Sequence, residues 1–422
     1  MDFLEVTVRR NPELIKAAVE LHQSGEVPPN TMVIDLDAIK ENAKVMKTEA
    51  DKYKISNYYI TKQFGRNPLV AQAIVNAGFE SSVAIDIDEV KTLHRYGLRI
   101  GHVGHLSQIP RADVKFVVKD VNPEVITIYS IEKAKEIAKA AHESGKKQEL
   151  LVRVVGEGDF FYPNQEGGFL ERDLVKAVRS INGLRGVRVV GVTSFPVLRF
   201  NLKTRREEPL PNFYTILRAA KKLEEDGVEV KQINAPADTS AKVMRLLAEM
   251  GATHGEPGHG FTGTTPWHAF DDLPELPAWV YVSEVSHKLG GRAFAYGGGL
   301  MSADACVGFW TDLYHSFRIY SLVGSDPDKI LERKLTALPA GYIDYYGTIF
   351  TTPTIPVEVG DTVVYGVREQ IFVSRAKVAV VSGIRKGRPR VQGIFDRNGT
   401  LLDRNDTPQS IEKVKDLMRI LE

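Results

Sequence analysis

The feature that most constrains the fold of this chain is a regular alternation of short apolar runs with longer amphipathic segments. The runs are rich in Val and Ile, which favours strands, and the segments between them carry apolar residues at helical spacing. Eight runs are expected to form strands: Tyr58–Ile60, Ser82–Ile85, Ile100–Leu106, Val125–Tyr129, Glu149–Val155, Val187–Thr193, Glu229–Asn234 and Ala252–His254. Eight parallel strands alternating with helices predict a closed (β/α)8 TIM barrel, whose functional site lies at the C-terminal ends of the strands. An open doubly wound sheet is the alternative.

The segments between these runs have the pattern of helices. The clearest are Leu69–Ala77, Asp88–Tyr96, Glu132–Glu143 and Phe213–Glu225. Gly78 is well placed to end the first of them, because glycine readily adopts the left-handed conformation that often follows a helix. The chain is therefore of the α/β class up to about the eighth run.

After Pro266 the pattern changes to strands separated by Gly- and Pro-containing turns. LPELPAWVYVSEVS, RAFAYGGG, TPTIPVEVGDTVVYG and QIFVSRAKVAVVSG are such segments, and they predict a separate β-rich domain. We expect an N-terminal extension at residues 1–30, the barrel at 31–270 and a C-terminal β domain at 271–422. The sequence leaves open which domain the extension packs against.

The charge and the cysteine content limit the kinds of partner. The chain has 55 Lys and Arg against 54 Asp and Glu, so no basic field predicts a nucleic-acid partner. Its one cysteine, Cys306, excludes an internal disulfide and a cysteine-only metal site. No HxH or HExxH spacing predicts a metal site, and no stretch of about 18 apolar residues predicts a membrane span. We expect a cytoplasmic protein that acts on a small molecule.

Lys62, in NYYITKQFGRNP, follows the first expected strand. A lysine at the mouth of a barrel loses hydration, which lowers its pKa and favours the neutral amine that forms an imine. By itself the motif also fits an ordinary solvated lysine.

Two further motifs follow the last two strands. THGEPGHGFTGTTP contains Gly258 and Gly260, and such glycines let backbone N–H groups approach a phosphate closely. INAPADTSAKV places Thr239 or Ser240 at a probable helix start, where hydroxyl and amide donors can bind the same phosphate. TIM barrels often bind phosphate near strands seven and eight. Ser240 also fits a plain helix N-cap.

Together these motifs resemble the alanine racemase-like, fold-type III family of pyridoxal phosphate (PLP) enzymes. TMVIDLDAIKENAKVM is similar to the start of that family's barrel, and Lys62 falls on its cofactor lysine. The most similar branch is the YhfX-type predicted amino-acid racemases. The resemblance implies a PLP Schiff base on Lys62, with the phosphate held near Thr239, Ser240, Gly258 and Gly260. His259 stands where the decarboxylase relatives have an arginine and could contact the phosphate.

The resemblance also assigns residues around the cofactor ring. Arg153 lies where the decarboxylase relatives have an arginine, which implies a contact with the phenolic oxygen or a nearby carboxylate; a surface arginine is the alternative. Phe195 matches the histidine that stacks on the pyridine ring, although it could equally be a core residue. Glu256 stands where alanine racemases have an arginine, in a GEPGHG motif closer to the EPGR of the ornithine and diaminopimelate decarboxylases. A carboxylate there stabilises the pyridinium and makes the ring a stronger electron sink.

The second acid/base of such a racemase is a tyrosine donated by the partner subunit. Tyr296, in RAFAYGGGLMSADA, is the first candidate, and it implies a homodimer. Tyr342, Tyr345 and Tyr346 are rivals, and a buried strand tyrosine is the alternative for Tyr296. Cys306 could match the cysteine of the decarboxylases but more simply fits a small core residue.

Two histidines lie in the third expected strand, in GHVGHLSQIP. Strict alternation puts His102 and His105 on opposite faces, so that at most one faces the barrel mouth. His105 is nearer the strand end and is the candidate substrate contact.

We therefore predict a PLP-dependent amino-acid racemase in which Lys62 and Tyr296 exchange the α-proton on opposite faces. A PLP-dependent decarboxylase or lyase is the alternative within enzymes. A non-catalytic PLP-binding protein and a barrel without cofactor are the alternatives from other classes.

Overall fold

The eight predicted strands form a closed parallel barrel. The computed structural model describes residues 2–299, 319–338 and 344–421. The barrel strands are β2 (Ser56–Ile60), β3 (Ser81–Ala84), β4 (Ile100–Val103), β5 (Val125–Ile128), β6 (Gln148–Val155), β8 (Val187–Thr193), β11 (Gln232–Asn234) and β12 (His254–Gly255). They pair in that order, and β12 pairs with β2 to close the ring. The closure confirms the (β/α)8 fold and excludes the open sheet.

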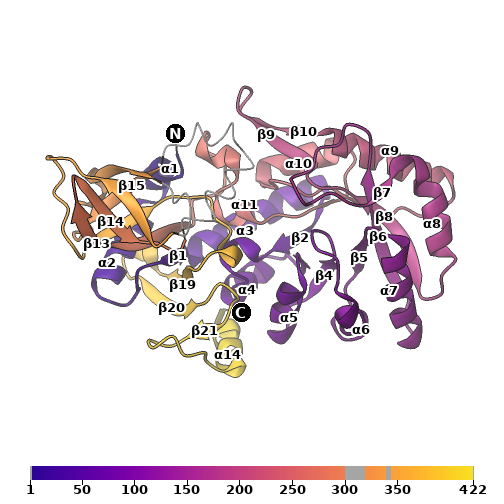
Figure 1. Cartoon of the computed structure of the whole chain (residues 1–422), viewed down its shortest axis with the longest axis horizontal. Helices are drawn as coiled ribbons and strands as arrows, with labels where there is room; N and C mark the ends of the chain where they lie inside the picture. Colours follow the sequence, from indigo (N-terminus) through magenta and orange to yellow (C-terminus); the bar gives the residue numbers. More distant parts are fainter. Residues whose placement is uncertain (1, 300–318, 339–343, 422) are drawn as a thin grey trace. The chain divides into compact units, whose positions relative to one another are not determined.

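Helices alternate with these strands along the chain. They are α3 (Leu36–Tyr53), α4 (Pro68–Asn76), α5 (Ile87–Arg95), α6 (Val114–Phe116), α7 (Ile131–Glu143), α8 (Leu174–Asn182), α9 (Pro211–Glu225) and α10 (Ala241–Glu249). Helices α5, α7 and α8 lie outside the strands (Figure 1). The sequence sets their ends: the Asn67 side chain accepts from the backbone N–H groups of Leu69 and Val70 at the start of α4, and Gly78 follows its end with a φ of +101°.

Small elements complete the loops at the strand ends. They are β7 (Phe169–Leu170), which pairs with β6, the hairpin β9 (Leu198–Asn201) and β10 (Arg206–Pro209), and the short helices η1 (Lys62–Phe64), α11 (His259–Thr262) and η5 (Pro266–Ala269). None of the helices in the described residues is long and apolar enough to cross a membrane.

The C-terminal strands form a second, mostly antiparallel sheet. Its order is β14 (Arg292–Tyr296), β17 (Tyr346–Phe350), β16 (Lys334–Leu338), β15 (Tyr320–Gly324), β18 (Thr362–Tyr365), β13 (Trp279–Leu289), β1 (Thr31–Asp35), β19 (Lys377–Ser382), β20 (Arg390–Phe395) and β21 (Leu401–Leu402). The short helix η7 (Ile371–Val373) precedes β19, and α14 (Ile411–Leu421) ends the chain. The expected β-rich domain is therefore present.

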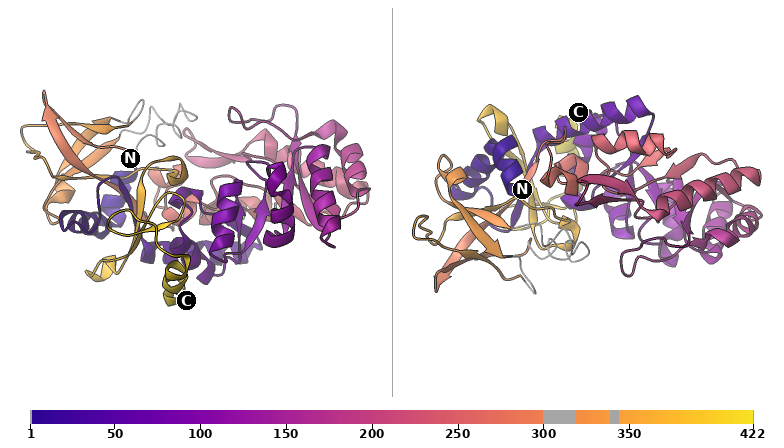
Figure 2. Two further views of the ribbon diagram at one scale, coloured as in Figure 1. Left: turned by 60° about the horizontal axis from the view of Figure 1, so that its bottom comes forward. Right: turned by 90° about the horizontal axis from the view of Figure 1, so that it is seen from above.

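The N-terminal residues belong to this sheet, where the expected boundary placed Thr31 onwards in the barrel. Strand β1 pairs antiparallel with β13 and parallel with β19. Helices α1 (Phe3–Arg10) and α2 (Pro12–Gln23) cover the sheet, and their apolar residues share a core with Val33, Val280 and Val364. Figure 2 shows the indigo helices beside the orange and yellow strands. The strands that neighbour Thr31–Asp35 in this sheet lie far from it in the sequence.

The described residues divide into two compact units. One consists of residues 1–45, 62–77 and 259–422, and the other of residues 46–61 and 78–258. The barrel strands all belong to the second unit.

Candidate active site

The polar residues predicted from the sequence gather at the C-terminal ends of the barrel strands. Arg153 lies near the end of β6, Phe195 follows β8, and Glu256 directly follows β12. Ser240 lies in the loop between β11 and α10. These ends meet at one mouth of a parallel barrel, which is the usual place for the functional site of this fold.

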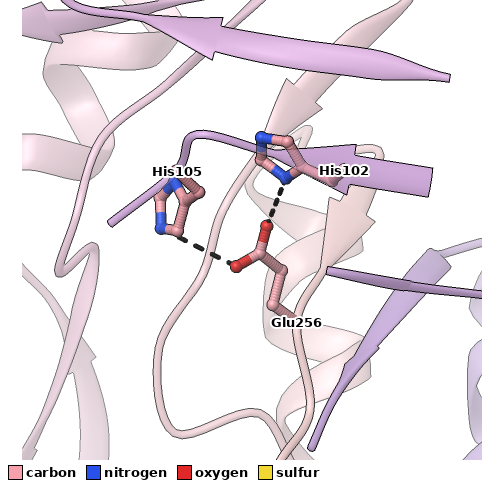
Figure 3. A group of neighbouring side chains, drawn as sticks. All are labelled: His102, His105 and Glu256. Atoms are coloured by element: carbon pink, nitrogen blue, oxygen red, sulfur yellow. Dashed lines mark hydrogen bonds and ion pairs between the residues drawn. The ribbon is translucent and has the colours of Figure 1, made fainter. Parts of the chain in front are cut away.

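Glu256 is the centre of a buried hydrogen-bond network at this mouth. Only 3% of the residue is exposed. Its Oε1 accepts from Nδ1 of His102 at 2.8 Å and from Nδ2 of Asn234 at 2.7 Å, while its Oε2 lies 3.7 Å from Nε2 of His105 (Figure 3). Burial raises the pKa of this carboxyl, but the two histidines and Asn234 outweigh burial and lower it to about 2. The network therefore holds a carboxylate ion.

The expectation that His102 and His105 cannot both face the mouth is wrong. Both rings lie beside Glu256, and their centroids are 5.4 Å apart (Figure 3). Strand β4 ends at Val103, and Gly104 turns the chain with a φ of +85°. A Cβ at this glycine would lie 2.5 Å from the carbonyl oxygen of Thr127, so only glycine fits the turn. Strand alternation therefore stops before His105.

Arg153 is buried, which excludes the surface alternative. Its guanidinium donates to the hydroxyl of Tyr129 and, at 2.6 Å, to the carbonyl oxygen of Gln165. Its Nε is buried and has no hydrogen-bond partner among the described residues. A buried cation with an unused donor is costly unless a ligand completes it. Arg153 is thus suited to an anionic or carbonyl-like oxygen.

The start of α10 offers one further unused donor. Ser240 lies at the N-cap position, as the N-cap alternative expected, but its side chain makes no capping hydrogen bond. Its Oγ is buried without a partner in the described part of the chain. The hydroxyl of Thr239 is occupied by the carbonyl oxygen of Ala237 at 3.3 Å. The Ser240 hydroxyl is therefore available to an acceptor such as a phosphate oxygen.

Phe195 and His105 pack against each other at the same mouth. Their rings meet edge to face with centroids 5.7 Å apart, and Phe195 also contacts Tyr162. Phe195 is half-buried, whereas His105 is almost fully buried. Phe195 is therefore not a plain core residue.

Lys62 and the residues after Gly258 belong to the other unit. Lys62 opens η1, two residues after β2 ends, and its Nζ lies 5.8 Å from the ring centre of Phe372. His259 and Gly260 begin α11 and are buried. Burial, followed by the charges of Arg368 and Lys62, lowers the pKa of His259 well below its ordinary value. Neutral His259 has a buried Nε2 without a partner among the described residues, which leaves it available to a ligand.

Tyr296 ends β14 and is 39% exposed, so the alternative of a buried strand tyrosine is wrong. Its ring lies 6.0 Å from that of Tyr346, and both Tyr345 and Tyr346 are exposed. Tyr342 and Cys306 lie outside the described residues.

Several residues of the network were missed from the sequence. The hydroxyl of Thr127 lies 2.6 Å from Nε2 of His102. Tyr129 accepts a hydrogen bond from Arg153, and Asn234 donates one to Glu256. All three are polar residues at or near the ends of apolar strands. That pattern is the signal that could have identified them.

The donor set fits PLP. Glu256 suits a protonated pyridine nitrogen, and the unused donors of Arg153 and Ser240, in the same unit, suit its oxygens and phosphate. The ligand atoms of His102, His105 and Glu256 also lie within 4.8 Å of one another, a grouping that can hold a metal ion. The sequence had predicted no metal site.

Both parts of the chain are similar in sequence to known proteins. Residues 34–266 match the family model "Alanine racemase, N-terminal domain", and residues 280–391 match "YhfX-like, C-terminal domain". The "Uncharacterized protein YhfX" of Escherichia coli (strain K12) is 38% identical over 401 residues, which cover 95% of this chain and 99% of that protein.

Two solved structures show the same fold at low sequence identity. D-threonine aldolase from Filomicrobium marinum has a TM-score of 0.65 at 14% identity, covering 88% of this chain and 95% of that one. Alanine racemase from Clostridium difficile 630 has a TM-score of 0.60 at 17% identity, covering 88% and 99%.

Proposed function

This chain belongs to the family with the alanine racemase N-terminal domain, in the branch with a YhfX-like C-terminal domain, and we propose that it is a PLP-dependent amino-acid racemase. The family is one of fold-type III PLP enzymes, and solved structures with the same fold include an alanine racemase and a D-threonine aldolase. The observation that carries the proposal is the ionised, buried Glu256 at the barrel mouth, at the end of the eighth strand, in a chain whose first strand leads to Lys62.

Each side chain has a distinct part in binding the cofactor. PLP, when bound, withdraws electrons from the α-carbon of an amino acid and makes its α-proton acidic. Glu256 would accept a hydrogen bond from the pyridine nitrogen and so keep it protonated. Arg153 would donate to the phenolic oxygen or to the substrate carboxylate, and Phe195 would pack against the ring. Thr239, Ser240, Gly258, His259 and Gly260 would hold the phosphate.

The proton transfers need a base on each face of the substrate. Lys62 would be the base on one face, and a tyrosine, Tyr296 first, would be the base on the other. The exposure of Tyr296 supports a site completed by the partner in a homodimer. His105 stays the candidate substrate contact, because its ring stands between Glu256 and Phe195.

A PLP-dependent decarboxylase or lyase is the second candidate. The EPG motif around Glu256, which is closer to that of the decarboxylases, favours it. The electron sink that the carboxylate supports would serve racemisation, decarboxylation and elimination alike. The likeness to an aldolase in fold supports it as well. A PLP-binding protein without catalysis is a third candidate; the candidate base Tyr296 in the β domain argues against it.

The decisive experiment incubates the PLP-loaded protein with a panel of single-enantiomer amino acids. Chiral chromatography should show the opposite enantiomer of at least one of them, and Lys62→Ala should show none. Release of carbon dioxide, ammonia or an aldehyde without the opposite enantiomer would assign the chain to the lyases. A protein without visible absorbance after PLP loading would exclude the cofactor altogether.

A further inference from the structure

We infer that His102, held in turn by Thr127, is a positioning residue that fixes which oxygen of Glu256 meets the cofactor. This inference rests on the proposed function, because it assigns a task to Glu256 at the pyridine nitrogen. It concerns two residues that need not touch the cofactor. The contacts that support it all lie within the barrel unit.

The two oxygens of Glu256 have different surroundings. Both hydrogen bonds to the carboxylate, from His102 at 2.8 Å and from Asn234 at 2.7 Å, end on Oε1. Nε2 of His105 lies 3.7 Å from Oε2, which is beyond hydrogen-bond distance (Figure 3). Oε1 is thus used by the protein, and Oε2 is the oxygen that can accept from a protonated pyridine nitrogen.

Thr127 determines how His102 presents its donor. Nδ1 must carry the proton to donate to the carboxylate, so in the neutral ring Nε2 is an acceptor. The hydroxyl of Thr127 lies 2.6 Å from Nε2 and can donate to it. The three groups then form a directed chain from Thr127 through His102 to Glu256. A hydrogen bond to the far nitrogen is the general means by which proteins set the tautomer and orientation of a histidine.

Packing leaves His102 little freedom to move. The residue is fully buried within β4, and Thr127 is fully buried in the neighbouring strand β5. The ring of Tyr58 lies 5.6 Å from the histidine ring. Without His102, Oε1 would lose a hydrogen-bond donor in a buried site. The Glu256 carboxylate would then lower its free energy by turning toward other donors. The carboxylate oxygens of Glu256 would then no longer be in position to accept from the pyridine nitrogen of the cofactor.

The test compares paired variants of each residue in the PLP-loaded protein. Thr127→Val removes the hydroxyl at constant volume, and Thr127→Ser restores it. His102→Phe removes both ring nitrogens, and His102→Asn restores a donor near the position of Nδ1. Three quantities are measured: the visible absorbance spectrum of bound PLP, the rate of α-proton exchange per bound PLP, and the KM of the substrate found.

We expect His102→Phe to slow exchange by about 10- to 150-fold and Thr127→Val by about 2- to 12-fold, with KM little changed. The absorbance band should shift in both variants. His102→Asn and Thr127→Ser should recover most of the rate and the spectrum. A purely structural role would lower the PLP content and the melting temperature but leave the spectrum and the rate per bound PLP as they are.

The results also separate this inference from the proposed function. If His102→Phe and Thr127→Val keep the wild-type spectrum and rate while Glu256→Gln loses both, the positioning role is wrong and the proposed function stands. If Glu256→Gln keeps both as well, Glu256 does not face the pyridine nitrogen. Metal analysis provides a further check, since a stoichiometric ion that is present in the wild type and lost in His102→Phe would replace the hydrogen-bond chain by a metal site.

Discussion

Replacing Glu256 by Gln should destabilise the folded protein, because the barrel holds this carboxylate in its ionised form. Burial raises its pKa, but His105, His102 and Asn234 lower it from the ordinary 4.5 to about 2. The difference of about 2.5 between the two pKa values corresponds to about 3 kcal/mol in the free energy of unfolding at neutral pH. Gln has a similar shape but no charge, so we expect Glu256→Gln to lose about 3 kcal/mol at pH 7.

The sign of the pH dependence follows from the lowered pKa. The stabilisation by the Glu256 carboxylate is complete above its pKa of 4.5 in the unfolded chain. It is lost as the pH falls through its pKa of about 2 in the folded protein. The difference between wild type and Glu256→Gln should therefore be about 1 kcal/mol smaller at pH 4 than at pH 7. Below about pH 2 it should nearly vanish.

Urea unfolding of the cofactor-free protein, followed by circular dichroism at pH 7, 5 and 4, measures this difference. Glu143→Gln, at the solvent-exposed end of α7, is the control and should stay within about 0.5 kcal/mol of wild type. Equal stability of wild type and Glu256→Gln at pH 7 would refute the reasoning. A difference that grows on acidification would refute it too, because the carboxyl would then be protonated in the folded state.

Three further predictions concern the cofactor and the second base. Borohydride reduction of the PLP-loaded protein should fix the label on a peptide containing Lys62, and recovery on another lysine would overturn the assignment. Ser240→Ala should weaken binding of PLP by about 2- to 12-fold but leave the affinity for pyridoxal, which lacks the phosphate; equal losses for both ligands would place Ser240 elsewhere. Mixing the inactive variants Lys62→Ala and Tyr296→Phe under conditions of subunit exchange should restore about half of the activity per mixed dimer, since one intact site forms. No recovery despite proven exchange would exclude Tyr296 as the donated base.

The barrel and its mouth were predictable because both are encoded locally. Each of the eight expected runs overlaps a strand, the last of them at His254 alone, and the helix expected at Leu69–Ala77 is found at Pro68–Asn76. Apolar periodicity reports the type of an element directly. Strand order in a (β/α)8 barrel follows chain order, so the residues at the strand ends are also placed by the sequence. Ser240 was proposed in this way, whereas Arg153 and Glu256 were proposed from the resemblance to the PLP family.

Only the tertiary structure decided which of these residues meet and which sheet β1 joins. The neighbours of β1, which are β13 and β19, lie hundreds of residues away in the chain, and no local signal identifies them. His102 and Glu256 are likewise 154 positions apart in the chain. The turn at Gly104 brings His105 to the same carboxylate, although strand alternation predicted otherwise. Periodicity describes a side chain's direction within one element, whereas the hydrogen bonds that hold Glu256 ionised depend on contacts between elements, which form only when the barrel closes.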